Sequence, residues 1–285
     1  MQAEQGARPQ ITAVICAWNE AENISYVLKH TAPYVDEMLV VDGHSKDKTR
    51  EIAEAHGARV VLDNKKGKGD AICVGIEKAK GDIIVFVDAD CSHNPHDIPA
   101  LVDPILMGVA DHVTGSRILG GSEELHGDFG KFMRRFGSDI ITMGINLRYG
   151  VGLTDSQNGF RALRTDIARK LDLKEEITTI EQEMIIKTLS LGARMAEVPT
   201  REFARRAGDS SFNVPTVAPR YVYTWLKYLV TQKPPPRAIR PGYSQYDNPK
   251  PWWRRDARIM TTDNMSIAAA GGDRKPRAPT IGGAA

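Results

Sequence analysis

Two carboxylates separated by one small residue follow a strongly apolar run of the chain. Residues 83–87 read Ile-Ile-Val-Phe-Val, and Asp88-Ala89-Asp90 comes directly after them. An apolar run of this length is typical of a buried strand, so the carboxylates are expected at a strand end. Two carboxylates so close can share Mg²⁺ or Mn²⁺ and leave coordination positions for phosphate. The pattern predicts a metal site at Asp88 and Asp90 that would offset charge on a diphosphate.

Polar residues also follow two other strand-like runs. Ala17-Trp18-Asn19-Glu20 comes after the first run, and Asp42 ends the second. Each residue alone could simply cap a helix or form a turn. In an open parallel sheet, however, ligands bind outside the carboxyl ends of the strands. Three polar strand ends together therefore predict that these side chains converge on one crevice.

A basic, glycine-rich loop precedes one of the helix-like segments. The loop reads Lys65-Lys66-Gly67-Lys68-Gly69-Asp70. Cationic side chains and main-chain N–H groups at a helix N-terminus suit a phosphate-bearing ligand. The loop lacks the spacing of the P-loop and of the dinucleotide-binding fingerprint. We expect Lys68 and Gly69 to contact the phosphates of a ligand, with a flexible surface turn as the alternative.

The elements that must position these residues alternate between two types in the first half of the chain. Short β-rich runs stand at residues 11–18, 37–42, 58–62, 83–87 and 112–117. Helix-like segments between them cover residues 20–30, 48–56 and 69–80, and a further helix is expected to begin at Pro95. Such alternation predicts βαβ units, and therefore an α/β fold with a mostly parallel central sheet flanked by helices.

The rhythm changes after about residue 117. Helix-like patterns cover residues 128–147 and 180–191, and strand-like or extended patterns cover residues 159–164 and 194–203. An aromatic, amphipathic segment spans residues 221–230, and three prolines follow it at residues 234–236. We expect a single domain at residues 10–232, a disordered tail at residues 1–9, and a largely disordered Pro/Gly/Arg-rich tail at residues 233–285.

Composition excludes several classes of protein. The chain has 285 residues, of which 41% are hydrophobic and 26% charged, and its net charge of +2 gives no reason to expect nucleic-acid binding. The three cysteines lack metal-ligand spacing, which favours free thiols in a reducing compartment. No apolar run approaches the roughly 20 residues that span a bilayer, and no signal peptide is evident. We therefore expect a cytoplasmic protein that at most lies on a membrane surface.

Taken in order, these motifs resemble those of the family 2 glycosyltransferases, which have the GT-A fold. The resemblance is carried by Ala17-Trp18-Asn19-Glu20, residues 41–49, Gly67-Lys68-Gly69 and Asp88-Ala89-Asp90. Residues 92–99, Gly115-Ser116-Arg117 and residues 155–162 further resemble the dolichyl-phosphate mannose synthase branch, the polyprenyl-phosphate glycosyltransferases. The resemblance covers about residues 10–215 and is specific only as an ordered set.

The resemblance implies roles for matching positions. A metal-bound nucleotide-sugar donor, GDP- or UDP-linked, would contact Ala17, Asn19, Glu20, Asp42, Lys68, Gly69, Asp88 and Ala89. The metal, Mg²⁺ or Mn²⁺, would lie on Asp88 and Asp90. The residues expected to take part in catalysis are Asp90, Arg117, Asp155 and Glu183. The residues expected to bind the acceptor are Arg117, Arg134, Arg161, Arg205 and Arg206.

Two positions depart from the family pattern. Ser92 stands where the family usually has a glutamine, a possible third metal ligand, and Ser211 stands where a lysine is common in the acceptor loop. The chain alone does not decide which of Arg205 and Arg206 matches the arginine of that loop. The missing lysine weakens the expectation of a standard lipid-phosphate acceptor.

The nature of the acceptor decides the mechanism. The family resemblance implies inversion in a single in-line displacement at the anomeric carbon. An alcohol acceptor would need a base, for which Asp155 and Glu183 are the candidates. A lipid phosphate is already ionised near pH 7, needs no base, and would be held by arginines. The arginines of the second half favour transfer of a mannose- or glucose-type sugar to a polyprenyl phosphate.

Other functions stay open. The first alternative is the same fold acting on a soluble small molecule or a polysaccharide end. A nucleotide-sugar-binding protein without transfer activity is disfavoured by the intact Asp88 and Asp90. A nucleotidyltransferase would show a glycine-rich loop where Trp18-Asn19-Glu20 stands. A lipid acceptor would also require a membrane, so we expect residues 221–230 to lie at the bilayer interface or a membrane subunit to bind, with packing of this segment on the core as the alternative.

Overall fold

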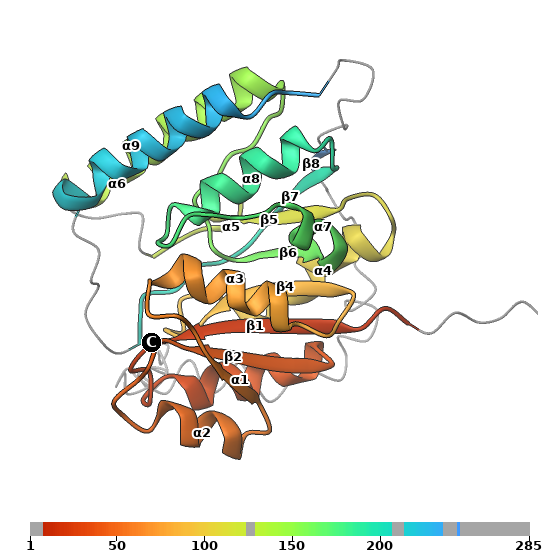
Figure 1. Ribbon diagram of the computed structural model, residues 1–285, viewed down its shortest axis with the longest axis vertical. Coiled ribbons are helices and arrows are strands. Elements are labelled where there is room, and N and C mark those ends of the chain that lie inside the picture. The colour runs from red at the N-terminus through yellow and green to blue at the C-terminus, as the bar shows by residue number, and fades with distance from the viewer. Residues whose placement is uncertain (1–7, 124–128, 207–213, 236–243, 246–285) are drawn as a thin grey trace, which may run out of the picture. The chain divides into compact units, whose positions relative to one another are not determined.

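The chain forms one mixed sheet in the computed structural model (Figure 1). The structure describes residues 8–123, 129–206, 214–235 and 244–245. In these residues the strand order is β3-β2-β1-β4-β6-β5-β7-β8. β6 runs antiparallel to β4 and β5, and every other neighbouring pair is parallel. This arrangement confirms the predicted α/β class with a mostly parallel sheet.

The strands are short and mostly buried. They are β1 (Ile11–Ala17), β2 (Glu37–Asp42), β3 (Arg59–Leu62), β4 (Ile83–Asp88), β5 (His112–Ser116), β6 (Arg161–Arg164), β7 (Met195–Pro199) and β8 (Ser244–Gln245). The helices are α1 (Ile24–Thr31), α2 (Thr49–Ala55), α3 (Lys68–Lys78), α4 (Ile98–Leu106), α5 (Arg117–Gly120), α6 (Phe129–Tyr149), α7 (Thr165–Lys170), α8 (Ile180–Ser190) and α9 (Val214–Thr231). Two 3₁₀ turns cover Ala32–Tyr34 and Pro95–Asp97.

Alternation along β1 divides the core between the two faces of the sheet. Ile11, Ala13 and Ile15 lie in one cluster with apolar side chains of α1, α2 and α4. Val14, on the opposite face, lies in a second cluster with side chains of α3, α7 and α8. Successive side chains of a strand point to opposite faces, so a continuous apolar strand buries both of them. The helices thus cover the sheet on both sides.

A third layer covers α8. Ile185 and Ile186 of α8 pack with Ile145 of α6 and Tyr228 of α9, while Met184 of the same helix packs toward the sheet. α8 is therefore buried on all sides. Figure 1 shows α6 and α9 running together across one end of the described domain. These two helices are placed to form a wall above the strand ends.

The order of the strands fixes where a ligand crevice must lie. The chain passes from β1 outward to β2 and β3 and then returns to β4, which pairs with the other side of β1. The direction of the connections therefore reverses between β1 and β4. A crevice forms outside the carboxyl ends at such a switch point. Asp88, the last residue of β4, stands at this point.

Two boundaries differ from the predicted ones. The aromatic segment predicted at residues 221–230 belongs to a longer helix, α9, which begins at Val214 and contains Pro219. A proline inside a helix removes one hydrogen bond, which is why the sequence pattern favoured a later start. β8 pairs with β7 inside the predicted C-terminal tail. Residues 1–7, most of residues 236–285, and Ser211 lie outside the described residues, so the predicted tails stay predictions.

Candidate functional site

A cavity of about 330 Å³ opens above the carboxyl ends of the central strands. Its floor carries the side chains of Lys68, Asp88 and Asp90, and one wall carries Arg117. The other walls come from α6 and α9, and they are largely apolar. The apolar lining consists of Met133, Gly137, Ile140, Ile141, Ala218, Val222 and Trp225. The cavity thus has a charged end on the sheet and an apolar end between two helices.

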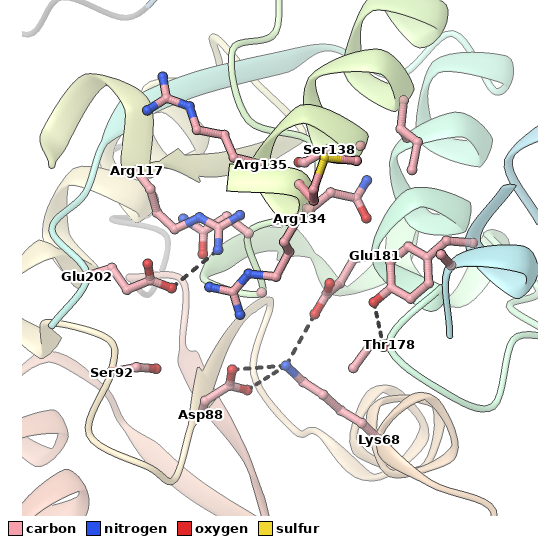
Figure 2. A pocket seen from close by; sticks show the side chains of 18 of the residues that line it. Lys68, Asp88, Ser92, Arg117, Arg134, Arg135, Ser138, Thr178, Glu181 and Glu202 are labelled. Carbon is pink, nitrogen blue, oxygen red and sulfur yellow. Dashed lines mark hydrogen bonds and ion pairs between the residues drawn. The ribbon is translucent and has the colours of Figure 1, made fainter. Parts of the chain in front are cut away.

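The floor of the cavity is organised around the ammonium of Lys68. This group lies 2.9 Å from both carboxylate oxygens of Asp88 and 3.2 Å from Oε1 of Glu181, as Figure 2 shows. Burial alone raises the pKa of Asp88, but the charge and hydrogen bonding of Lys68, together with the charge of Arg205, outweigh it and hold that pKa well below its usual range. Burial alone would lower the pKa of Lys68, but the carboxylates of Asp88 and Glu181 raise it by more. The net shift of the Lys68 pKa is therefore upward. Lys68, Asp88 and Glu181 thus pair with one another on the floor of the cavity, where a charged ligand could contact them.

A glycine makes room for this arrangement. A methyl group at Gly159 would lie 3.1 Å from the Lys68 ammonium, 3.2 Å from Glu181 and 3.4 Å from Asp88. Gly159 belongs to the turn that precedes β6, and it lines the cavity with Asn158. The Asn158-Gly159 turn therefore lies directly on the charged floor.

His93 supports Asp88 from below, a role that the sequence did not predict. Its Nδ1 accepts a hydrogen bond from the main-chain N–H of Asp88 at 3.1 Å, and its ring stacks on Phe160 at 4.7 Å between centroids. Burial lowers the pKa of His93 despite the nearby Asp88 carboxylate, so the ring is neutral near pH 7. A neutral ring can accept that hydrogen bond, and the stacking fixes its orientation.

Asp90 is buried, and both of its oxygens have partners. Oδ1 accepts from the N–H of Ser92 at 3.0 Å and from its hydroxyl at 2.6 Å, and Oδ2 lies 3.0 Å from Nη2 of Arg205. Ser92, which also lines the cavity, therefore orients the carboxylate of Asp90. Arg205, and not Arg206, reaches the strand-end loop, because Arg206 stacks over the ring of Tyr26 at 5.1 Å.

The donor set at this loop fits a hard divalent cation that is shared with a ligand. Among the described residues, no three His, Cys, Asp or Glu side chains group closely enough to hold a metal by themselves. Mg²⁺ in particular does not need such a cage, since it commonly uses one or two carboxylates and completes its shell with water and phosphate oxygens. Asp88 and Asp90 could supply the two carboxylates that this mode of binding uses.

Arg117 is fixed by two carboxylates. Its Nε and Nη2 donate to Asp155 at 2.6 and 3.0 Å, and Nη1 donates to Glu202 at 3.2 Å. Burial alone would lower the pKa of Arg117, but Asp155 and Glu202 raise it by more than burial lowers it. The pKa of Arg117 therefore lies above its usual value. Burial raises the pKa of Asp155, yet the Arg117 charge and its hydrogen bonds bring the net value below the usual one. Glu202, which no sequence motif indicated, completes this network together with the hydroxyl of Ser122.

The strand ends predicted to bind the nucleotide lie beside one another. The N–H of Asn19 donates to the Ser45 hydroxyl at 2.8 Å, and Oδ1 of Asn19 accepts from the N–H of Lys46 at 2.8 Å. Asp42 is fully buried; its Oδ2 accepts from the N–H of Ser45 at 2.9 Å, while its Oδ1 accepts no hydrogen bond from the residues that the structure describes. An unsatisfied buried carboxylate oxygen is costly, so this atom suits a donor from a ligand.

Ala17 and Glu20 close the loop after β1. The carbonyl of Ala17 accepts from the N–H of Gly43 at 2.8 Å, which ties the ends of β1 and β2 together. The Glu20 carboxylate accepts from Nδ2 of Asn23 at 2.7 Å. Burial raises the pKa of Glu20, and the nearby Asp90 carboxylate raises it further. The two segments predicted to contact the donor are thus held by each other.

Glu183 does not line the cavity, so it is not placed to take a proton from an acceptor there, and its predicted role as a base is wrong. Glu183 is fully buried under α9 and accepts from the N–H groups of Lys174 and Glu175 and from the Tyr228 hydroxyl at 2.8 Å. Its salt bridge to Lys187 is 2.7 Å long. Residues two apart on a helix point about 200° apart. Glu181 therefore faces the cavity while Glu183 faces away.

Arg161 and Gly69 also have structural surroundings that argue against direct ligand contact. Arg161 is fully buried, and its guanidinium donates to the carbonyls of Asn158 and Glu181. The N–H of Gly69 donates to the Glu176 carbonyl at 2.8 Å, and a methyl group at Gly69 would overlap this main chain. Gly69, at the start of α3, therefore allows close packing against this main chain. In the basic loop, Lys68 is the residue that lines the cavity.

α6 contributes further arginines to the cavity wall. Figure 2 shows Arg134 extending from this helix toward the Lys68 and Glu181 side chains. Arg135 also lines the cavity and lies 3.9 Å from Asp139 one turn away. Together with Arg117 and Arg205, Arg134 places positive charge around the carboxylates of the floor, whereas Figure 2 shows Arg135 directed away from them.

Comparison of the sequence with known proteins finds several relatives. A low-salt glycan biosynthesis hexosyltransferase of Haloferax volcanii is 27% identical over 75% of the chain, which spans only 52% of that longer protein. An undecaprenyl-phosphate mannosyltransferase of Micrococcus luteus is 28% identical over 72% of the chain and 88% of its own length. About half of the first relative therefore has no counterpart here.

A solved structure matches the fold as well. Glucosyl-3-phosphoglycerate synthase of Mycobacterium tuberculosis, in complex with Mn²⁺, UDP-glucose and phosphoglyceric acid, has a TM-score of 0.62 and 26% identity. The match covers 80% of this chain and 82% of that one. The family model described as glycosyl transferase family 2 matches residues 12–172, more than half of the 285 residues. The chain belongs to glycosyl transferase family 2.

Proposed function

We propose that this chain is an inverting, metal-dependent hexosyltransferase that moves a mannose- or glucose-type sugar from a GDP- or UDP-sugar to a polyprenyl phosphate. One observation carries the proposal. The cavity joins an end rich in arginine and carboxylate, at the point where Asp88 and Asp90 stand, to an apolar end between α6 and α9. A substrate with an anionic head and an apolar chain matches both ends.

The donor is assigned to the strand ends on the β1, β2 and β4 side. The unpartnered Oδ1 of Asp42 would accept a hydrogen bond from the base or the ribose. Asp88 and Asp90 would hold Mg²⁺ or Mn²⁺, which when bound neutralises charge on the departing nucleoside diphosphate. The ammonium of Lys68 lies beside both oxygens of Asp88, so it would add positive charge near the same phosphates.

The acceptor side needs positive charge rather than a base. A phosphate monoester is ionised near pH 7 and can attack the anomeric carbon without losing a proton first. Asp155 is unsuited to take a proton, because both of its oxygens accept from Arg117 and its pKa is lowered. We therefore assign Asp155 a positioning role toward Arg117. Arg117, Arg134 and Arg205 would hold the acceptor phosphate.

The apolar end would take the first isoprene units of the acceptor. Met133, Ile141 and Trp225 present apolar surface next to the arginines and offer few groups that a polar acceptor could bind. The undecaprenyl-phosphate mannosyltransferase among the relatives carries an acceptor of this type in its name. We place the enzyme at the cytoplasmic face of a membrane, alone or with a membrane subunit. Among the described helices, none is both long and apolar enough to cross a bilayer.

A second candidate acceptor is a small phosphorylated molecule. The solved structure of glucosyl-3-phosphoglycerate synthase contains phosphoglyceric acid together with UDP-glucose. Such an acceptor would use the same arginines and leave the apolar end without a role. Both candidates carry a phosphate that the arginines could bind. They differ in the group attached to it, and an acceptor that attacks through a hydroxyl would also need a base.

Transfer assays separate these candidates. The chain would be incubated with Mn²⁺ and a panel of GDP- and UDP-hexoses, with either a short polyprenyl phosphate or phosphoglyceric acid as acceptor. We expect labelled sugar in the lipid fraction, and its loss in Asp90→Asn. Transfer to phosphoglyceric acid alone would establish the second candidate. Folded protein that neither binds nor consumes any nucleotide sugar would overturn the proposal.

A further inference from the structure

The carboxylate of Glu175, in the loop between α7 and α8, is a meeting point for side chains of α9. Glu175 is 6% exposed and does not line the cavity. Its Oε1 accepts from Nζ of Lys227 at 3.0 Å, and the Tyr228 hydroxyl lies 3.3 Å from the same oxygen. Its Oε2 accepts from the Thr224 hydroxyl at 3.3 Å, and Nη2 of Arg220 lies 3.7 Å away. Four side chains of one helix thus surround a single buried carboxylate.

These four side chains lie on one face of α9, and the adjoining face lines the cavity. Positions 220, 224, 227 and 228 fall within about 100° of one another around the helix axis. The cavity-lining positions of α9 fall within a second arc of about 100°, centred roughly 120° from the first; they are Ala218, Tyr221, Val222 and Trp225. A rotation of α9 would move both faces together. Whatever holds the first face therefore decides which side chains reach the cavity.

Glu175 is charged where it meets these groups. Burial raises the pKa of Glu175, but hydrogen bonds from Lys227 and Thr179 and the charge of Lys227 outweigh it, so the pKa lies below its usual value. Thr179, at the end of the same loop, donates to Oε2 at 2.9 Å. A carboxylate can only accept hydrogen bonds, and all five side chains around it can donate them. The match between one acceptor group and several donors fixes the loop and α9 relative to each other.

The main chain of the same loop is anchored on the charged floor of the cavity. The carbonyl of Glu176 accepts from the N–H of Gly69 at 2.8 Å. A methyl group at Gly67 would lie 2.9 Å from this carbonyl, and one at Gly69 would overlap the loop. Lys68, whose ammonium organises the floor, stands between these two glycines. The loop is therefore fastened to the floor by its main chain and to α9 by the side chain of Glu175.

Two further contacts hold α9 on either side of the cavity. The Tyr221 hydroxyl donates to Oγ1 of Thr178 at 2.6 Å, and both side chains line the cavity. Against α6, the indole of Trp225 lies beside Gly144. α9 is thus placed between the loop and α6, and these contacts together set the width of the apolar end.

We propose that Glu175 is a positioning residue for the acceptor. Its carboxylate holds α9 in one rotation about the helix axis relative to the floor, and so presents Tyr221, Val222 and Trp225 to the apolar end of the cavity. The assignment rests on the proposed function in one respect, namely that the acceptor lies between α6 and α9. Because Glu175 does not line the cavity, it acts through α9 and not on a reacting atom.

Steady-state kinetics of Glu175→Gln test this assignment. A carboxamide keeps the shape of the side chain, but its NH₂ group cannot accept, so one of the two sets of donors loses its partner. We expect KM for a short polyprenyl phosphate to rise about tenfold while KM for the nucleotide sugar changes by less than about twofold, because a displaced wall weakens only the substrate that it positions. The matched control is Asp172→Asn in the same loop. Its side chain is 76% exposed and pairs with Lys174 instead of α9, so both KM values should stay unchanged.

A purely structural role predicts a different result. Loss of folded protein would lower the apparent kcat and leave both KM values unchanged, and this outcome would overturn the assignment. An equal rise in KM for donor and acceptor, or the same change in Asp172→Asn, would overturn it as well.

Hydrogen exchange of α9 keeps the two proposals separable. An unaltered chain that transfers no sugar to polyprenyl phosphate refutes the proposed function, and the exchange rates then decide the role of Glu175. Faster exchange along α9 in Glu175→Gln, but not in Asp172→Asn, would support the hold of Glu175 on this helix. Equal exchange in the unaltered chain and both variants would overturn it.

Discussion

Arg205 forms an ion pair with Asp90, the carboxylate that follows β4, at a distance of 3.0 Å. Asp90 is also one of the two carboxylates predicted to hold a divalent cation. A guanidinium and a cation cannot both be the nearest partner of this oxygen. A metal bound through this oxygen would therefore weaken the pair and free Arg205 to turn toward the phosphate of the acceptor.

The first prediction concerns metal affinity without substrate. Arg205→Ala removes the competing cation, so Mn²⁺ alone should bind about fivefold more tightly, which corresponds to an ion pair of about 1 kcal/mol. Transfer to the acceptor should fall in the same variant. Calorimetric titration of Mn²⁺ measures the first effect. Arg206→Ala is the control, since Arg206 stacks on Tyr26; equal Mn²⁺ affinity in all three proteins would contradict the role of Arg205.

The strand ends were predictable because they depend on periodicity alone. An apolar run followed by Asp88 reads as a buried strand wherever it stands, and parallel strands bring their carboxyl ends to one edge. The antiparallel direction of β6 was not predictable, because no local pattern in Arg161–Arg164 records which way a strand pairs. The start of α9 was missed because Pro219 resembles a helix boundary.

The second prediction contrasts two carboxylates on α8. Glu181→Gln should lower kcat/KM at least about tenfold, since Glu181 shares the Lys68 ammonium with Asp88. Glu183→Gln should instead lower the free energy of unfolding by about 3–5 kcal/mol, because it leaves Lys187 without its buried partner. Urea unfolding and steady-state kinetics on the folded fraction separate the effects. A large loss of activity in folded Glu183→Gln would restore it as a catalytic candidate.

The sequence could not decide between these two glutamates. Both stand beside Gln182 near the start of α8, and this helix is buried on all sides, so it has no polar face from which its orientation could be predicted. The predicted role of Arg161 in acceptor binding was wrong for a similar reason. Its burial and its hydrogen bonds to the carbonyls of Asn158 and Glu181 depend on how β6 packs against α8, which the sequence does not show. Lys68 was easier to assign because its loop precedes a helix at the predicted sheet edge.

The third prediction is a pH dependence of stability. The pKa of folded Asp155 lies below that of an unfolded aspartate, about 3.9, so its contribution is complete above about pH 4 and is lost as pH falls below that value. Asp155→Asn should lower the free energy of unfolding by about 3–5 kcal/mol near pH 7, since Arg117 stays buried. The difference from the unaltered chain should shrink as the solution becomes more acidic.

Urea unfolding at several pH values measures this difference. The control is Asp139→Asn, whose side chain is exposed on α6 and should change stability by less than about 1 kcal/mol. A gap between Asp155→Asn and the unaltered chain that grows toward low pH would have the wrong sign. It would mean that Asp155 is protonated in the folded state, and would reopen its role as a base.

The fourth prediction tests the cavity wall formed by α6 with a glycine-to-alanine substitution at two positions, Gly144 and Gly137. A methyl group at Gly144 would lie within 2.8 Å of Cε2 of Trp225 and closer still to Cζ2, whereas one at Gly137 meets nothing within 4 Å. Gly144→Ala should therefore destabilise the chain by about 1–3 kcal/mol through overpacking. Gly137→Ala should stabilise it by up to about 1 kcal/mol, because alanine favours a helix.

The same two variants test whether α6 and α9 only form a structural wall or also bind the acceptor. In Gly144→Ala the indole of Trp225, which lines the cavity, must move, so KM for a short polyprenyl phosphate should rise while KM for the nucleotide sugar stays the same. Comparison with phosphoglyceric acid as acceptor extends the test, since a small acceptor does not need the apolar end. An equal rise in KM for both acceptors would place the effect of α6 on the charged floor. The groove between α6 and α9 would then have no part in acceptor choice.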